Sequence, residues 1–259
     1  QAHGQWLPRK QAKRWANVRL QSLLQMSSGI VDYWEDAAMQ SYLRHQSGMD
    51  ARRSATEVLR WASQKGLLYE PGSHWSYADT NYLILVKLIE HLDQQSFAEA
   101  VRHRLTGATS LAMSHTHVGA QSLPADHMRL LAADAVRLQH AGIGSRFLLS
   151  STQDMAYWFA ALFDRRTEPL GAISQMRSLV SKRTAKPVTA IKDTAYGMAL
   201  DRAWHPELGV YWYYPGQSWE GAALLMWLPA SQQVIAVALN KAVAVENLRA
   251  MLIRLIIAS

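Results

Sequence analysis

Hydrophobic residues recur at helical spacing in the first two thirds of the chain and gather in short runs in the last third. Apolar positions three and four residues apart predict helices over 18–26, 54–64, 81–92 and 155–163. From residue 196 onward, β-rich runs bounded by Gly, Pro and Asn predict strands over 196–200, 209–214, 222–228 and 234–239. A last helical pattern covers 246–257. The order of elements therefore predicts an α+β fold, with an antiparallel sheet and a helix packed across it.

Two capping boxes mark the expected starts of helices. Ser54 is followed three residues later by Glu57, and Ser96 by Glu99. In this arrangement the serine hydroxyl accepts the backbone N–H of the glutamate, and the glutamate carboxylate accepts the backbone N–H of the serine. We therefore expect one helix to begin at Ser54 and another at Ser96.

Composition excludes several classes of protein. With 49% hydrophobic and 18% charged residues among 259, the chain can bury a large core and is expected to form one globular body. It has no cysteine, which excludes disulfides, thiolate zinc sites and a cysteine nucleophile but leaves the redox compartment open. No apolar run reaches the roughly 20 residues of a membrane helix; the closest, 251–258, contains Arg254. We expect no transmembrane segment.

The net charge of +7 raises the question of nucleic-acid binding. The basic residues form only two short runs, near residues 9–14 and 182–186, and neither run carries a motif of a DNA- or RNA-binding module. We interpret them as solvated faces, and we expect no nucleic-acid partner. The chain begins at Gln1 without an initiator methionine or a signal-type apolar core, so we expect a processed or truncated product.

Four short motifs, in one order, carry a family resemblance. They are Ser27-Ser28-Gly29-Ile30, the segment 71–82 with Tyr77-Ala78-Asp79, Ser151-Thr152-Gln153-Asp154-Met155, and Tyr196-Gly197-Met198 before the strands. The chain resembles the serine β-lactamase and penicillin-binding-protein superfamily from about Trp6 to the terminal helix, and within it the branch of class C-like β-lactamases, D-alanyl-D-alanine peptidases and esterases. The resemblance implies a β-lactamase/transpeptidase-like fold, in which an antiparallel sheet flanked by helices is joined by a helical subdomain. On this basis we expect one domain over 1–259, with the helical subdomain at about 18–190 and the sheet and closing helix at about 193–259.

Tyr77 and Asp79 are the catalytic candidates that the resemblance implies. Tyr77 matches the tyrosine of the family's YxN motif, which shuttles protons during acyl transfer. Asp79 stands where the family usually has Asn, and a carboxylate can only accept hydrogen bonds, so recognition of a lactam or peptide amide should weaken. The alternatives are that Tyr77 is a buried core residue and that Asp79 caps a helix beginning near Asn81.

Tyr214, Gly216 and Gln217 are the candidates for substrate binding. They fall where the family has its KTG, HxG or WxG strand segment. With Tyr214 in the position of the lysine, a cation for a substrate carboxylate is absent, which favours an ester or neutral substrate; Gln217 could offset part of that loss. The alternative is that Tyr214 is an aromatic strand residue facing the core.

The family's nucleophile motif, SxxK, is absent from these residues. No serine has a lysine three positions later, and the one TxxK, from Thr189 to Lys192, is far from the expected place. Either the nucleophile lay on residues removed before Gln1, or it is on a second polypeptide, or it was never present. Because the first strands of the family's sheet would also be missing, an exposed sheet edge and a partner segment are expected.

Two rival sites remain. Ser218 lies in Gly216-Gln217-Ser218-Trp219-Glu220, which approaches the GxSxG nucleophile elbow, but the last glycine is missing and a strand follows where a helix is required. His115 and His117 are two residues apart, a spacing that would place both imidazoles on one side of a strand. No further ligand follows in the sequence to complete a metal site. We favour neither, and we expect no metal and no cofactor.

The resemblance therefore predicts a periplasmic or envelope-associated serine hydrolase that acts by acyl transfer on an ester, a β-lactam or a D-alanyl peptide. Its partner would be a small-molecule or peptidoglycan-type substrate. The alternative is a catalytically inactive homologue that binds peptidoglycan or a protein partner through the same cleft. Asp79 and the segment around Tyr214, which lacks a cation, motivate that alternative.

Overall fold

The computed structural model describes residues 13–45, 51–107, 116–118, 148–163, 172–217 and 221–258. These residues fall into two compact units. The first contains 13–45, 51–107, 116–118, 148–149 and 183–185, and the second contains 150–163, 172–182, 186–217 and 221–258. The division places the helix over 152–163 with the sheet rather than with the other helices; the expected single domain over 1–259 stays a prediction.

The first unit is mainly helical. Its elements are η2 (Lys13–Trp15), α2 (Leu20–Leu24), α3 (Ala37–His45), α4 (Ala51–Lys65), α5 (Asp79–Asp93), α6 (Phe97–Gly107) and the antiparallel pair β1 (His117–Val118) and β2 (Leu148–Leu149). Helix α5 packs against α2, α4 and α6. Its residues 83–85 are buried with Val58 and Leu59 of α4 and with Ile30 of the loop after α2. Helix α5 is thus the central element of this unit, as its mostly apolar sequence predicts.

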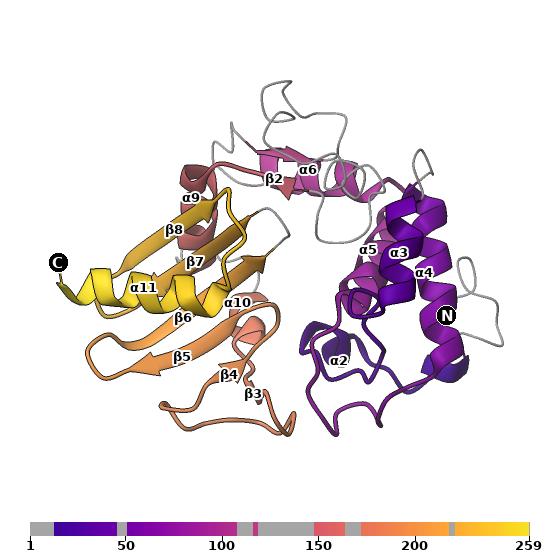
Figure 1. Ribbon diagram of the computed structural model, residues 1–259, viewed down its shortest axis with the longest axis horizontal. Helices are drawn as coiled ribbons and strands as arrows, with labels where there is room; N and C mark the ends of the chain where they lie inside the picture. The colour runs from indigo at the N-terminus through magenta and orange to yellow at the C-terminus, as the bar shows by residue number, and fades with distance from the viewer. Residues whose placement is uncertain are drawn as a thin grey trace. The chain divides into compact units, whose positions relative to one another are not determined.

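The second unit is a six-stranded antiparallel sheet with helices. Its elements are α9 (Thr152–Phe163), α10 (Ala172–Met176), β3 (Val180–Ser181), β4 (Ala195–Tyr196), β5 (Asp201–His205), β6 (Gly209–Gln217), β7 (Ala222–Leu228), β8 (Gln233–Leu239) and α11 (Val245–Ala258). The strands lie in chain order from β3 to β8 (Figure 1). This is the antiparallel meander that the short β-rich runs predict.

Helices α11 and α9 cover opposite faces of this sheet. Along β7, Leu224 and Met226 pack with Leu248 and Leu252 of α11, whereas the intervening Leu225 packs with Phe159 of α9. Successive side chains of a strand point to opposite faces, so the two cores lie on the two sides of the sheet. The apolar run of β7 has no polar face because both of its faces are buried.

Two of the expected element boundaries are wrong. Of the expected strand over 196–200, only Tyr196 lies in a strand, at the end of β4. The residues 197–200 connect β4 to β5, because Gly197 N–H donates to Leu200 O at 2.7 Å and Ala199 has a φ of 64°. The run alternates like a strand, but Gly197 ends the pairing. Helix α4 begins at Ala51 rather than at Ser54, so Ser54 lies inside the helix and is not its cap.

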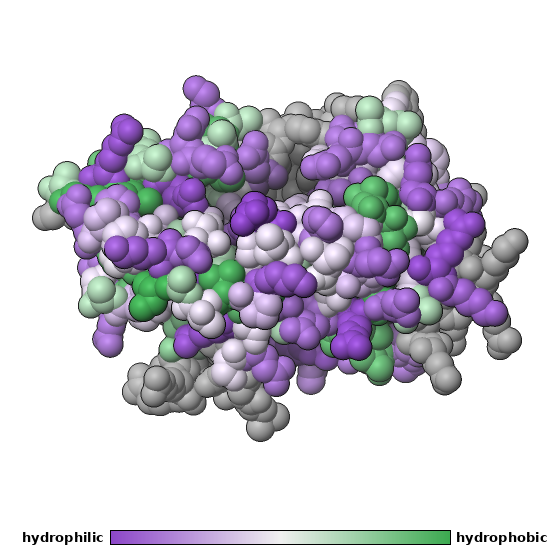
Figure 2. All heavy atoms as spheres, turned by 90° about the horizontal axis from the view of Figure 1, so that it is seen from below, coloured by the Kyte–Doolittle hydropathy of each residue, from purple (hydrophilic) through white to green (hydrophobic). Residues whose placement is uncertain are grey.

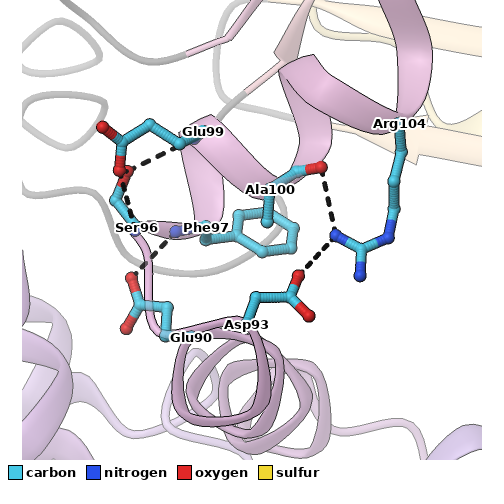
Figure 3. Close-up of polar contacts among 7 residues, drawn as sticks. All are labelled: Glu90, Asp93, Ser96, Phe97, Glu99, Ala100 and Arg104. Carbon is cyan, nitrogen blue, oxygen red and sulfur yellow. Dashed lines mark hydrogen bonds and ion pairs between the residues drawn. The ribbon is translucent and has the colours of Figure 1, made fainter. Parts of the chain in front are cut away.

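The capping box at Ser96 is confirmed, and it fixes the junction of α5 and α6 (Figure 3). Ser96 N–H donates to the Glu99 carboxylate at 2.9 Å, and Glu99 N–H donates to Ser96 Oγ at 3.2 Å. From α5, Glu90 accepts the Phe97 N–H. Asp93 pairs with Arg104 of α6. Each of these contacts satisfies or screens a polar group at a helix end.

Polar side chains dominate the face of the molecule drawn in Figure 2, where apolar side chains form separate small patches. Leu68, Leu92, Ile191 and Leu255 are among the exposed large apolar residues and come from different elements. Single exposed apolar residues of this kind are ordinary on a protein surface.

Candidate functional site

Three consecutive residues at the start of α5 bond to the loop that follows α2. Asp79 N–H donates to Asp32 Oδ1 at 3.1 Å, Thr80 Oγ donates to Val31 O at 2.7 Å, and Ser28 Oγ donates to Asn81 Oδ1 at 2.7 Å. We call these three contacts the α5 straps. They fix the loop over 28–34 to the first turn of the helix, next to Tyr77.

The innermost strap is fully buried. Ser28 and Asn81 are at most 1% exposed, and Asn81 Nδ2 also donates to Met26 Sδ at 3.3 Å. Ser28 Oγ in turn accepts the Ile30 N–H at 3.1 Å. Buried polar groups of this kind are stable only when each is hydrogen-bonded. The Ser27-Ser28-Gly29-Ile30 motif is therefore a structural support for α5, and Ser28 is buried rather than open to a substrate.

Gly29 lets this loop approach the segment 68–76. Its φ is +77°, and a Cβ at this position would lie 2.3 Å from Tyr69 O. Two backbone hydrogen bonds join the segments here: Gly29 O accepts the Leu68 N–H, and Ser27 O accepts the Gly72 N–H. Only glycine fits such a close approach of two backbone segments.

Tyr77 and Asp79 lie together at the start of α5. Tyr77 OH donates to Asp79 Oδ1 at 2.9 Å, and Tyr77 is 46% exposed, so the alternative of a buried core tyrosine is wrong. The cap residue of α5 is Ala78, and Asp79 is the first helical residue, so the alternative of Asp79 as a helix cap is also wrong. A carboxylate in the first turn still interacts favourably with the helix dipole.

Asp32, which none of the sequence motifs includes, accepts a backbone hydrogen bond from Asp79 of this pair. Its Oδ1 accepts the N–H groups of both Trp34 and Asp79. Burial raises the pKa of Asp32 to about 7, and the charges of Asp79 and Glu35 act in the same direction, while the two N–H groups act against it. A carboxyl group in this environment changes its charge near neutral pH.

Tyr214, Gly216 and Gln217 lie at the end of β6 in the second unit. The pairing of β6 with β5 ends at Tyr213. The residues Tyr214–Gln217 extend beyond it and pair with β7 on their other side. Pro215 is compatible with this stretch, since proline is tolerated where a strand is paired on one side. Tyr214 is 40% exposed, so the alternative of a core-facing residue is wrong.

A buried polar cluster lies beside this strand end, and the sequence analysis missed it. Asp201 of β5 is opposite Tyr213 of β6 and accepts a 2.8 Å hydrogen bond from Lys182 Nζ. The Arg249 guanidinium of α11 lies 4.7 Å from the centre of the Tyr213 ring. Burial raises the pKa of Asp201, and Lys182 and Arg249 oppose that rise. A charged residue at the first position of a short strand is the signal that could have found it.

The rival sites involve Ser218, His115 and His117. Ser218 and His115, and the side chain of His117, lie outside the described residues. Within the ranges that the structure describes, no group of three His, Asp or Glu side chains is placed to hold a metal ion. In the same ranges, no helix has the length and apolar character to cross a membrane.

Comparison with known proteins identifies a family. A family model described as Beta-lactamase matches residues 4–258. The fold is similar to that of a D-stereospecific amidohydrolase from Streptomyces sp. (20% identity, TM-score 0.69, covering 87% of this chain and 68% of that one). It is also similar to a penicillin binding protein from Bacillus halodurans (16%, 0.70, 93% and 73%). A D-amino acid amidase from Ochrobactrum anthropi SV3, in complex with D-phenylalanine, is a third (16%, 0.66, 92% and 75%). At these identities the three structures bear on the fold.

Proposed function

Because this chain belongs to the beta-lactamase family, we propose that it works as a serine hydrolase by acyl transfer on an ester, a β-lactam or a D-alanyl peptide. The chain has no SxxK motif, so the proposal requires a nucleophilic serine outside these 259 residues. That serine would lie on a preceding segment of the same protein or on a second polypeptide. In the reaction its Oγ attacks the acyl carbon and the leaving group departs with a proton; water then releases the acyl group from the serine.

The exposed hydroxyl of Tyr77 is the observation that supports this proposal best. It lies at the start of α5, in the segment that matches the family's YxN motif, and its proton is already in a hydrogen bond to Asp79 Oδ1 at 2.9 Å. A tyrosine in this position can take up the proton that the serine hydroxyl loses as it attacks and pass a proton to the leaving group, so that it ends the step in its original form. We assign Tyr77 the proton-transfer role, with Asp79 as its hydrogen-bond partner.

The side chains of Asp79 and of the β6 end favour an ester substrate over an amide substrate that carries a carboxylate. An Asp79 carboxylate cannot donate to a substrate carbonyl, as the amide of Asn could. Tyr214 and Gln217 provide uncharged side chains where the family's motif has a lysine. We therefore propose that Tyr214, Gly216 and Gln217 orient an uncharged or ester substrate, and that the protein works at the cell envelope, as family analogy suggests.

A catalytically inactive homologue is the second candidate function. The observation that favours it is Asp79, which stands where the family usually has Asn and whose carboxylate cannot donate a hydrogen bond to a substrate carbonyl. In that case the protein would bind peptidoglycan or a protein partner without turnover.

Labelling of purified native material with a fluorophosphonate separates the two functions. We expect one polypeptide to gain the mass of the probe in an intact-mass measurement under denaturing conditions. The Tyr77→Phe variant should label at least about a hundredfold more slowly, in line with the loss of a general acid–base group. The matched control is Tyr157→Phe, since Tyr157 is a similarly exposed tyrosine on α9. Absence of label on every chain present would contradict the hydrolase and leave the binding function.

The Asp79→Asn variant tests the substrate preference. It restores an amide donor, so we expect labelling by a fluorescent β-lactam to rise relative to labelling by the fluorophosphonate. An unchanged ratio of the two rates would contradict the role given to Asp79.

A further inference from the structure

We propose that Asp32 is a positioning residue for the Tyr77–Asp79 pair, and that the charge of its carboxylate controls how firmly Asp79 is held. This inference rests on the proposed function, because it names the group that regulates the same site. It assigns Asp32 no contact with substrate.

The geometry makes Asp32 the link between the loop and the reactive pair. One oxygen, Oδ1, accepts the Trp34 N–H at 3.0 Å and the Asp79 N–H at 3.1 Å. The Asp79 N–H belongs to the first turn of α5, where backbone donors have no acceptor within the helix. The Asp79 carboxylate then accepts the Tyr77 hydroxyl. A shift of Asp32 would therefore move the backbone of Asp79 and with it the partner of Tyr77.

Asp32 is also the ionisable member of the α5 straps. The neighbouring straps, through Thr80 and through Ser28 with Asn81, use hydroxyl, amide and backbone groups that do not titrate in this pH range. Changes in pH should thus act on the outermost strap, which is the one nearest to Tyr77.

The groups that face Asp32 explain the direction of the effect. Asp79 on α5 and Glu35 on the loop are the charges that act on it, and burial contributes most to a pKa of about 7. The ionised carboxylate accepts stronger hydrogen bonds from the Trp34 and Asp79 N–H groups than the neutral acid does. Asp79 should therefore be held firmly above about pH 7 and more loosely below it.

The test compares labelling rates across pH in the purified native protein. With a fluorophosphonate between about pH 5 and 9, we expect the wild type to show a step near pH 7 that the Asp32→Asn variant lacks. Asn keeps an oxygen acceptor for both N–H groups but does not titrate. Asp32→Ala should label at least about tenfold more slowly at all pH values, since misplacing a reacting group by an ångström can cost about a hundredfold.

Asp36→Asn is the matched control, because Asp36 Oδ1 also accepts a backbone N–H, that of Met39. It should keep the wild-type profile. The same step in Asp32→Asn, or a wild-type rate in a folded Asp32→Ala variant, would overturn the proposal.

Hydrogen exchange provides a readout that does not depend on activity. In peptides covering 77–81, Asp32→Ala should lose protection and Asp36→Asn should not. If the wild type takes no label, the proposed function fails, and this measurement then decides the positioning role by itself. Equal protection in Asp32→Ala and wild type would overturn it.

Discussion

Ser28 and Asn81 form a hydrogen bond of 2.7 Å between two fully buried side chains that are 53 residues apart in sequence. The bond links the Ser-Ser-Gly turn to the helix that begins at Asp79. It explains why a serine in that turn matters even though it is closed to solvent.

Removal of this bond should destabilise the protein. We expect Asn81→Ala to lower the free energy of unfolding by about 1–3 kcal/mol, because the Ser28 hydroxyl loses its buried acceptor. Ser28→Ala should also be destabilising. In a double-mutant cycle by urea denaturation, the two losses should sum to more than the loss in the double variant. Strict additivity would contradict the contact.

Substitution of Gly29 should be more costly than substitution of another glycine with the same backbone angle. Gly66 has a φ of +80° with open space around it, so Gly66→Ala should cost about 1–2 kcal/mol from the angle alone. Gly29→Ala adds the clash with Tyr69 O, and we expect a loss of about 3 kcal/mol or more. Thermal melts of both variants check this, and equal losses would contradict the role of the close approach.

The capping box of α6 should contribute measurably to stability. Ser96→Ala removes the acceptor of the Glu99 N–H and should lower the free energy of unfolding by about 1 kcal/mol, whereas Ser96→Asp should retain most of it. Ser231→Ala is a suitable control, since the hydroxyl of the exposed Ser231 donates to the side chain of the exposed Gln233. A Ser96→Ala variant as stable as the control would show that the box is dispensable.

The pair of Lys182 and Asp201 should make stability depend on pH. Burial already raises the pKa of Asp201, so its contribution to stability is fully present below the unfolded pKa of about 4 and is lost as pH rises through the folded pKa. Lys182→Met removes the nearest cation and should raise that pKa further. Because Lys182 is 35% exposed, we expect a modest loss of about 1–2 kcal/mol at pH 8.

The loss in Lys182→Met should be smaller at a lower pH than at pH 8, because the raised pKa of Asp201 favours its neutral acid as the pH falls. Urea denaturation at the two pH values measures the difference. Adding Asp201→Asn to Lys182→Met should recover part of the stability at pH 8. A loss that is the same at both pH values would contradict this account.

Much of the fold could be predicted from hydrophobic periodicity. The strand over 222–228 is observed with the expected bounds, since both of its faces are buried and its ends are marked by Gly221 and Pro229. The strand β5 could not be found this way, because its Asp201 and Arg202 are buried through specific partners rather than by apolar character. Hydrophobic periodicity indicates where apolar side chains are buried, but it does not indicate where charged side chains are buried with a partner.

The site was predictable in part. The motif order placed Tyr77 and Asp79, and the structure brings them into contact. Asp32 could not be predicted as a site residue, because an aspartate after a Ser/Gly turn is typical of an ordinary loop. Its importance depends on a backbone N–H 47 residues further along the chain, which a local pattern cannot reveal.

The α5 straps also have a consequence for folding. Each of them joins residues about 50 positions apart, so the loop over 28–34 gains these bonds only after α4 and the segment 66–78 have been folded back between the two partners. Closing a loop of that length costs entropy before any contact is made, which makes such contacts slow to form. Tyr77 and Asp79 should therefore acquire their arrangement late and all at once, and variants that weaken a strap should speed unfolding more than they slow folding.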